Sequence, residues 1–219
     1  MERVLEPDLM EDPAQALAYA RADFAEVNQG FVDRFRAMFP ELSTGSVLDL
    51  GCGPADIPIR LVRALLGLQI TAVDGSAAML AHARKAVTEA GLTDRIRLLC
   101  ARVPGLALPP RSFDAIVSNS LLHHLEDPHP FWQEVQRLGG PGARVFVMDL
   151  FRPDSPEGAR EIVETAAANE DPLLKRDFFS SLLASWTVAE VRSQLALTLP
   201  HLDCRVVSER HWLVSGRLP

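Results

Sequence analysis

The stretch that most constrains the fold is VLDLGCGPADIPIRL, residues 47–61. Its first residues are apolar apart from Asp49, and apolar residues resume at Ile57 in a stretch that we expect to be helical. Gly51 and Gly53 lie between the two parts, and the lack of a Cβ atom lets the backbone turn sharply and approach a ligand. The pattern predicts a strand that turns into a helix at a ligand site.

Alternation of strands and helices continues through residues 46–150. Short apolar and β-branched runs alternate with helical stretches, namely SVLDL, QITAVD, RIRLLC, FDAIVSN and ARVFVMDL. Such alternation is typical of a parallel sheet with helices on both faces. The closing segments CRVVSER and HWLVSGR predict two antiparallel strands joined by a tight turn.

Asp74 ends the second predicted strand, where a carboxylate can accept hydrogen bonds from two ribose hydroxyls. A dinucleotide site would need the pattern G-x-G-x-x-G, with helix amides open to a pyrophosphate. Here Asp56 occupies the third glycine position, and Pro54 has no amide donor. The sequence therefore favours a nucleoside that carries a cationic centre and no phosphates.

Composition limits the partners and the compartment. The formal net charge is −7 and the basic residues form no cluster, so nucleic-acid binding is not expected. No apolar run is long enough to span a bilayer, and the acidic N-terminus lacks the apolar core of a secretory signal. Three widely spaced cysteines, Cys52, Cys100 and Cys204, favour free thiols in a reducing compartment. We therefore expect a cytoplasmic protein that does not bind membranes.

Four segments together resemble the class I S-adenosylmethionine-dependent methyltransferases: VLDLGCGPADIPIRL, ITAVDGSAAML, RSFDAIVSNSLLHHLEDP and LGGPGARVFVMDLFRP. The resemblance covers roughly residues 47–153. It implies an α/β, Rossmann-like fold whose seven-stranded sheet has the order 3-2-1-4-5-7-6, with the last strand antiparallel, helices on both faces and a helical cap. It also implies S-adenosylmethionine as cofactor and S-adenosylhomocysteine as product.

On this resemblance, residues 1–219 form one methyltransferase domain. We divide it into an N-terminal helical cap (1–45), a cofactor-binding core (46–150), a helical lid insertion (151–186), and a last helix with the closing strand pair (187–219).

The resemblance also implies a set of cofactor-binding residues. Asp49 would orient the methionine amino group, Asp74 would take the ribose hydroxyls, and the backbone carbonyl of Asn119 would accept from the ammonium group. The whole set is Asp49, Gly51, Cys52, Gly53, Asp74, Gly75, Met79, Arg102, Val103, Asn119, Tyr19 and Asn28. Arg102 stands where many relatives have an Asp that accepts a hydrogen bond from adenine, and arginine cannot accept one. Backbone carbonyls or water must therefore accept the hydrogen bond from adenine.

Methyl transfer is an in-line displacement, which needs a general base only when the acceptor must lose a proton. His123 and His124 are the candidate bases, because a neutral imidazole accepts a proton near neutral pH. No metal site is expected, because adjacent histidines do not share a helical face and no Cys or carboxylate pair completes a site.

Acceptor contacts are predicted from the end of the fifth strand and the segment that follows it: Asp149, Phe151, Arg176, Phe178, Phe179 and Trp186. They indicate a small organic acceptor under a helical lid. Two alternatives stay open: a non-catalytic module that binds S-adenosylmethionine or a nucleoside, and an NAD(P)-dependent oxidoreductase. The oligomeric state, monomer or dimer, also stays open.

Overall fold

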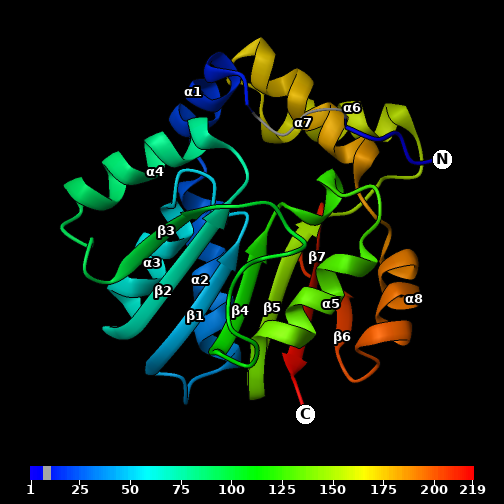
Figure 1. Ribbon diagram of the computed structural model, residues 1–219. Helices are drawn as coiled ribbons and strands as arrows, with labels where there is room; N and C mark the ends of the chain where they lie inside the picture. The colour runs from blue at the N-terminus through cyan, green and yellow to red at the C-terminus, as the bar shows by residue number, and fades with distance from the viewer. Residues whose placement is uncertain (7–10) are drawn as a thin grey trace.

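The computed structural model describes residues 1–6 and 11–219 (Figure 1). The remaining residues of the predicted N-terminal cap, 7–10, lie outside the described part of the chain. At the centre is a seven-stranded sheet of order β3-β2-β1-β4-β5-β7-β6. Its strands are β1 (Thr44–Leu50), β2 (Gly67–Asp74), β3 (Ile96–Cys100), β4 (Phe113–Asn119), β5 (Gly139–Leu150), β6 (Asp203–Val206) and β7 (His211–Arg217).

Strands β1 to β5 pair in parallel, and β7 runs antiparallel to both of its neighbours, β5 and β6. The predicted strand order and the antiparallel last strand are therefore confirmed. All of the parallel strands end at the same edge of the sheet, which Figure 1 shows beneath the helical cap.

Helices cover both faces of the sheet. The first face packs against α2 (Ala25–Met38), α3 (Asp56–Ala64) and α4 (Ala77–Glu89), and the second against α5 (His129–Leu138) and α8 (Val188–Thr198). Successive strand residues point to opposite faces, so Val47 joins the first core cluster and Leu48 the second. The near-continuous apolar strands follow from burial on both sides.

The cap over the carboxyl ends of the strands consists of α1 (Pro13–Arg21), α6 (Pro156–Ala166) and α7 (Pro172–Ala184) (Figure 1). We call α6 and α7 the lid. The two lid helices pack on each other through their own apolar cluster, which includes Val163 and Leu182. Helix α2 was predicted as part of the cap, but Phe31 and Phe35 are fully buried in the sheet core, with their rings edge-on to Phe146 of β5.

Local capping explains where these helices begin. The side chains of Asp12, Ser155 and Asp171 accept hydrogen bonds from the first turns of α1, α6 and α7, each of which has a proline at its start. Thr187 and Glu190 form a capping box at the start of α8. Within the described ranges, no helix has the length and apolarity needed to cross a membrane.

Candidate active site

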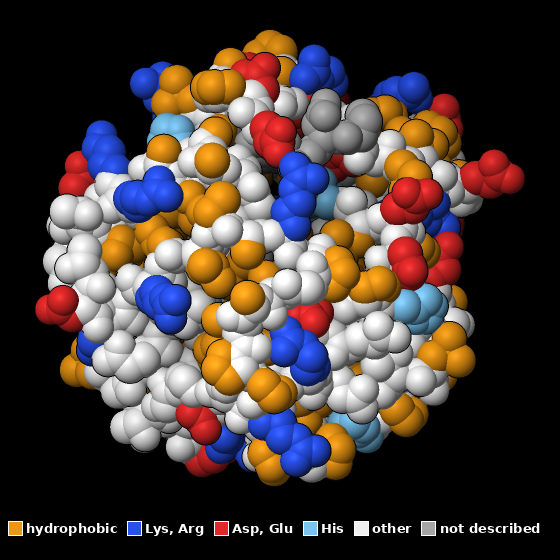
Figure 2. Space-filling model, in the orientation of Figure 1, with side chains coloured by type: hydrophobic (Ala, Val, Ile, Leu, Met, Phe, Trp, Pro, Cys, Tyr) orange, Lys and Arg blue, Asp and Glu red, His pale blue; other side chains and the backbone are white. Residues whose placement is uncertain are grey.

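A cavity of about 410 Å³ lies between the strand ends and the cap. Its walls come from the ends of β1, β2 and β4, from α1, from the lid helix α7, and from the short 3-10 helix η1 (Leu122–His124) that follows β4. The volume is in the range of small-molecule sites, which are generally concave and largely apolar. On the face shown in Figure 2, a hollow lies below the cap, with hydrophobic side chains and a few charged ones around it.

The glycine turn after β1 lets the backbone reach the cavity. Gly51 has φ +78° and Gly53 has φ +51°, in the left-handed region that favours glycine. A Cβ atom on Gly51 would lie 3.0 Å from the Leu121 side chain, so the turn is closely packed on one side. The amides of Gly51 and Cys52 both donate to the carbonyl of Val73, at 2.8 and 2.9 Å, and join the turn to β2.

Asp74 closes the same turn from β2. Its Oδ2 accepts from the Gly53 amide and its Oδ1 from the Ser76 amide, both at 2.8 Å. Burial raises the pKa of Asp74, and the two amide hydrogen bonds oppose that rise. Each carboxylate oxygen has further acceptor capacity. The group can therefore accept hydrogen bonds from two neighbouring hydroxyls.

Two buried oxygens at the strand ends lack hydrogen-bond partners. Within the described residues these are Oδ2 of Asp49, which is 2 % exposed, and Oδ1 of Asn119. Burial, with the charge of Asp74 as a second cause, raises the pKa of Asp49 to about 8. Unpartnered buried acceptors are costly, so each of these oxygens is available to a cationic ammonium group that binds directly or through a water. The methionine end of S-adenosylmethionine carries such a group.

Apolar and backbone surfaces form the opposite end of the cavity. Gly75, Met79 and Val103 line it, together with Arg102. The guanidinium of Arg102 turns outward and pairs with Glu11 at 2.7 Å, where both side chains are largely exposed. Arg102 stands where many relatives have an adenine-binding Asp, but its positive charge points away from the cavity.

Tyr19 and Asn28 also line the cavity, as predicted residues of the N-terminal segment. Burial raises the pKa of Tyr19 to about 12, so its hydroxyl stays neutral. The amide of Asn28 donates to Asp56 at 2.9 Å, and Arg60 pairs with the same carboxylate at 2.7 Å. Asp56 is thus held at the start of α3, at the position of the absent third glycine.

The two histidines of η1, which we call the histidine turn, line the cavity with their rings 4.1 Å apart. His123 Nδ1 lies 2.6 Å from Asp149 Oδ1. Burial by itself would lower the pKa of His123, but the charge and the hydrogen bond of Asp149 raise it above the usual value. Burial and the neighbouring charge of His123 lower the pKa of His124 to about 3, so His124 is neutral.

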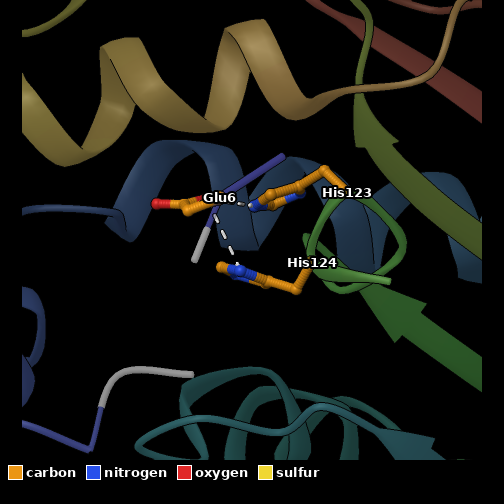
Figure 3. Close-up of side chains that lie close together, drawn as sticks. All are labelled: Glu6, His123 and His124. Carbon is orange, nitrogen blue, oxygen red and sulfur yellow. Dashed lines mark ion pairs between the residues drawn. The ribbon is translucent and has the colours of Figure 1, made fainter. Parts of the chain in front are cut away.

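Glu6 contacts the histidine turn and was not predicted from the sequence. Its Oε2 lies 3.5 Å from His124 Nδ1 and 3.8 Å from His123 Nε2 (Figure 3). Burial is the main reason that the pKa of Glu6 is raised. No motif marks Glu6 in the sequence. We expected no Cys or carboxylate pair to complete a metal site, but folding brings this one carboxylate close to both histidines.

Of the predicted acceptor residues, only Phe178 lines the cavity. Asp149 is 1 % exposed and lies behind His123, and it also accepts from the amides of His123 and Leu150. Trp186 donates from its indole nitrogen to Leu122 and is covered by the guanidinium of Arg3. Asp149 and Trp186, predicted to contact the acceptor, therefore lie outside the cavity lining.

The other three predicted acceptor residues also lie outside the cavity lining. Phe151 packs in the apolar cluster of the second sheet face. Phe179 lies with its ring 5.5 Å from the Arg160 guanidinium, and the side chain of Arg176 is 65 % exposed and pairs with Asp177. Adjacent positions on a helix point about 100° apart, which is why Phe178 reaches the cavity and Phe179 does not.

Other cavity residues were not predicted, chiefly Asp177 and Ser181 of α7 and His211 of β7. Asp177 and Ser181 are four residues apart, a spacing that places both on one helix face, so the sequence did carry that signal. Burial lowers the pKa of His211 to about 4.

Residues 48–147 match the family model described as a methyltransferase domain. An uncharacterized methyltransferase of Mycobacterium bovis is 33% identical over 190 residues, which cover 84% of this chain and 91% of that protein. The 27-O-demethylrifamycin SV methyltransferase of Amycolatopsis mediterranei is 28% identical over 137 residues, covering 63% of this chain and 50% of that protein.

A solved structure of an S-adenosylmethionine-dependent methyltransferase from Aquifex aeolicus has the same fold. The two structures superpose with a TM-score of 0.68 and 18% sequence identity. The match covers 95% of this chain and 99% of that one. Together with the strand order, the glycine turn and the relatives, this likeness shows that the chain belongs to the class I S-adenosylmethionine-dependent methyltransferases, with S-adenosylmethionine as its cofactor.

Proposed function

We propose that this enzyme transfers the methyl group of S-adenosylmethionine to a small organic acceptor bound between the histidine turn and the lid helix α7. The observation that carries the proposal is the continuity of the cavity. One continuous space is lined by Asp74 and Gly75 at one end and by His124, Phe178 and Ser181 at the other. Cofactor and acceptor can therefore meet inside it without crossing bulk water.

The chain's own residues bind, orient and exclude water. S-adenosylmethionine supplies an activated methyl group on its sulfonium. Asp74 accepts hydrogen bonds from the ribose, while the unpartnered oxygens of Asp49 and Asn119 bind the ammonium group. Holding both reactants in line converts the transfer into an effectively unimolecular step, and the lid keeps water away from it.

Several features support a small acceptor rather than a polymer. The acceptor end lies under α7, and a site covered in this way suits a molecule that can be enclosed. The net charge is −7, and on the face shown in Figure 2 Lys and Arg side chains are scattered among acidic ones, which does not favour a nucleic-acid backbone. The similar rifamycin enzyme is named for a small-molecule substrate.

An acceptor hydroxyl would have to lose its proton, and His123 is the better of the two candidate bases. Nδ1 of His123 is hydrogen-bonded to Asp149, which leaves Nε2 of His123 directed toward Glu6. With a pKa of about 3, His124 is a weak base at neutral pH.

The proposal is tested with methyl-labelled S-adenosylmethionine and a panel of small hydroxyl, amine, thiol and carbon acceptors. Transfer of label, with stoichiometric S-adenosylhomocysteine, is the expected result for at least one class. Phe178→Ala should raise the KM for that acceptor and leave cofactor affinity unchanged. Phe179→Ala is the matched control, because its ring lies outside the cavity. Tight cofactor binding without transfer to any acceptor would contradict the proposal and favour a non-catalytic module.

A further inference from the structure

We propose that Glu6, His123 and His124 form a binding site for one divalent transition-metal ion at the acceptor end of the cavity. Each residue offers one ligand atom, and these atoms all lie within 4.8 Å of one another. Figure 3 shows the three side chains converging from two parts of the chain, the N-terminal segment and η1. No motif of the methyltransferase core includes Glu6.

The spacing suits an ion better than direct hydrogen bonds. Oε2 of Glu6 lies 3.5 Å from one histidine nitrogen and 3.8 Å from the other, at or beyond the limit of a useful hydrogen bond. Two ligands of a tetrahedral zinc ion, each at about 2.0–2.1 Å from the metal, are themselves roughly 3.3–3.5 Å apart. Small side-chain adjustments would place all three atoms around one ion.

His124 supplies an independent observation. Its Nδ1 is buried and has no hydrogen-bond partner within the described residues, although it faces Glu6. Buried polar atoms are normally satisfied, and one that is not requires an explanation. A metal ion would satisfy it.

The other two proposed ligands, His123 and Glu6, are each oriented by a further hydrogen bond. Asp149 accepts the hydrogen on Nδ1 of His123, which leaves the lone pair of Nε2 for a metal. The hydroxyl of Ser181 donates to Oε2 of Glu6 at 3.0 Å. Such carboxylate–histidine–metal arrangements hold the ring in one tautomer and one orientation. A divalent ion would also balance the charges of the two carboxylates, Glu6 and Asp149.

The N-terminal strap, residues 1–6, is held against the histidine turn and the lid by side-chain and backbone contacts. Arg3 donates to the carbonyls of His123 and Leu125, both at 2.8 Å, and its guanidinium lies 3.7 Å from the Trp186 ring centroid. The amide of Val4 donates to Leu183 of α7 at 3.1 Å. The strap that carries Glu6 is thus bound directly to the histidine turn and to the lid.

The donor set indicates the class of metal. Two imidazoles and one carboxylate suit Zn²⁺, Co²⁺, Ni²⁺ or Fe²⁺, whereas Mg²⁺ and Ca²⁺ prefer oxygen ligands alone. Three protein ligands leave one tetrahedral position open, as in catalytic zinc sites. Since both histidines line the cavity, that position is available to water or to a heteroatom of the acceptor. This last role rests on the proposed function, but metal binding itself does not.

The test uses the full-length chain after treatment with a chelator, titrated with Co²⁺ and followed by visible absorption and calorimetry. We expect a single Co²⁺ per chain, with the intense absorption of a four-coordinate ion. Glu6→Gln and His124→Ala should each weaken binding by at least ~10-fold, and Asp149→Asn by ~10–100-fold. Glu2→Gln, an exposed carboxylate on the same strap, and Cys100→Ser, an exposed thiol, are controls that should leave affinity unchanged.

Undiminished Co²⁺ affinity in Glu6→Gln would overturn the proposal, as would the absence of binding by the wild-type chain. Circular dichroism of each variant shows whether it is folded, and the mild Glu6→Gln change retains a side chain of the same size. Neither acceptor nor turnover enters the measurement. A failed acceptor screen therefore leaves the metal site standing, and a failed titration leaves methyl transfer standing.

Discussion

The imidazole of His123 and the carboxylate of Asp149 form a buried pair, with Nδ1 and Oδ1 2.6 Å apart although the residues are 26 positions apart in sequence. Asp149 lies near the end of β5, and His123 follows β4, its neighbour in the sheet. Adjacent parallel strands thus bring the two together, and the carboxylate determines which ring nitrogen faces the cavity. Asp149 is a positioning residue in this arrangement, whether His123 accepts a proton or binds a metal.

Asp149→Asn should lower kcat by at least ~10-fold and leave the Kd for S-adenosylmethionine nearly unchanged, because the amide no longer fixes the ring tautomer. Steady-state kinetics on an acceptor identified by the screen, with calorimetry for the cofactor, give the two values. Glu126→Gln, an exposed change near the same turn, is the control. An Asp149→Asn enzyme with full kcat would remove the positioning role.

Asp74→Ala should weaken S-adenosylmethionine binding by ~1–3 kcal/mol, because the ribose hydroxyls would lose their charged acceptor. Calorimetric titration measures the change, and Asp94→Ala, at an exposed site, should behave as wild type. Asp74 also accepts two backbone amides, so a thermal melt must show that the turn remains folded. Unchanged affinity in a folded Asp74→Ala protein would refute the ribose assignment.

Cofactor affinity should rise with pH between about 6 and 8. Burial raises the pKa of Asp49 to about 8, so below that pH the side chain is protonated in the free protein and must release its proton to bind an ammonium group. That release weakens binding by up to about tenfold for each pH unit below the pKa. Titrations across this range, in buffers of different ionisation enthalpy, detect the proton. In Asp49→Asn this rise should disappear, and a wild-type affinity that is flat with pH would contradict the assignment.

Acid should destabilise the fold partly through His211. Burial, and then the charge of Arg210, lowers its pKa to about 4, whereas an unfolded histidine titrates near 6.5. The unfolded state therefore takes up the proton first. The stability from neutral His211 is complete above about pH 6.5 and is lost as the pH falls toward 4, by at most about 3 kcal/mol. Urea unfolding between pH 7.5 and 5 should show a smaller loss in His211→Gln than in wild type, and equal losses would exclude this residue.

Arg3→Ala should release the N-terminal strap. The guanidinium donates to several carbonyls of η1 and the lid, and their loss costs roughly 1–3 kcal/mol. Hydrogen exchange should increase in residues 1–6, and the unfolding midpoint should fall. Arg3→Lys should restore little of the protection from exchange or of the unfolding midpoint. An ammonium lacks the planar fork that reaches two carbonyls and stacks on Trp186. Unaltered exchange in Arg3→Ala would show that the strap is held by other contacts.

Local pattern was enough to predict the sheet and the turn that faces the cofactor. The alternation of strands and helices, with the resemblance, led to the observed strand order. Gly51, Gly53 and Asp74 lie together at one edge because parallel strands end there, and this follows from sequence position alone. The capping residues of α1, α6, α7 and α8 can also be identified from the sequence, because each side chain hydrogen-bonds to the first turn of its own helix.

The acceptor end was decided by tertiary packing. The aromatic residues of the lid are alike in sequence, but helix phase and the covering Arg3 place Phe178 in the cavity and leave Phe179 and Trp186 outside. Glu6 carries no sequence signal at all, because its partners are histidines from the middle of the chain. Sequence by itself determined the periodicity, the caps and the glycine turn, which depend on neighbouring residues. Only the folded structure decided which distant segments meet, because that depends on how helices and strap pack over the sheet.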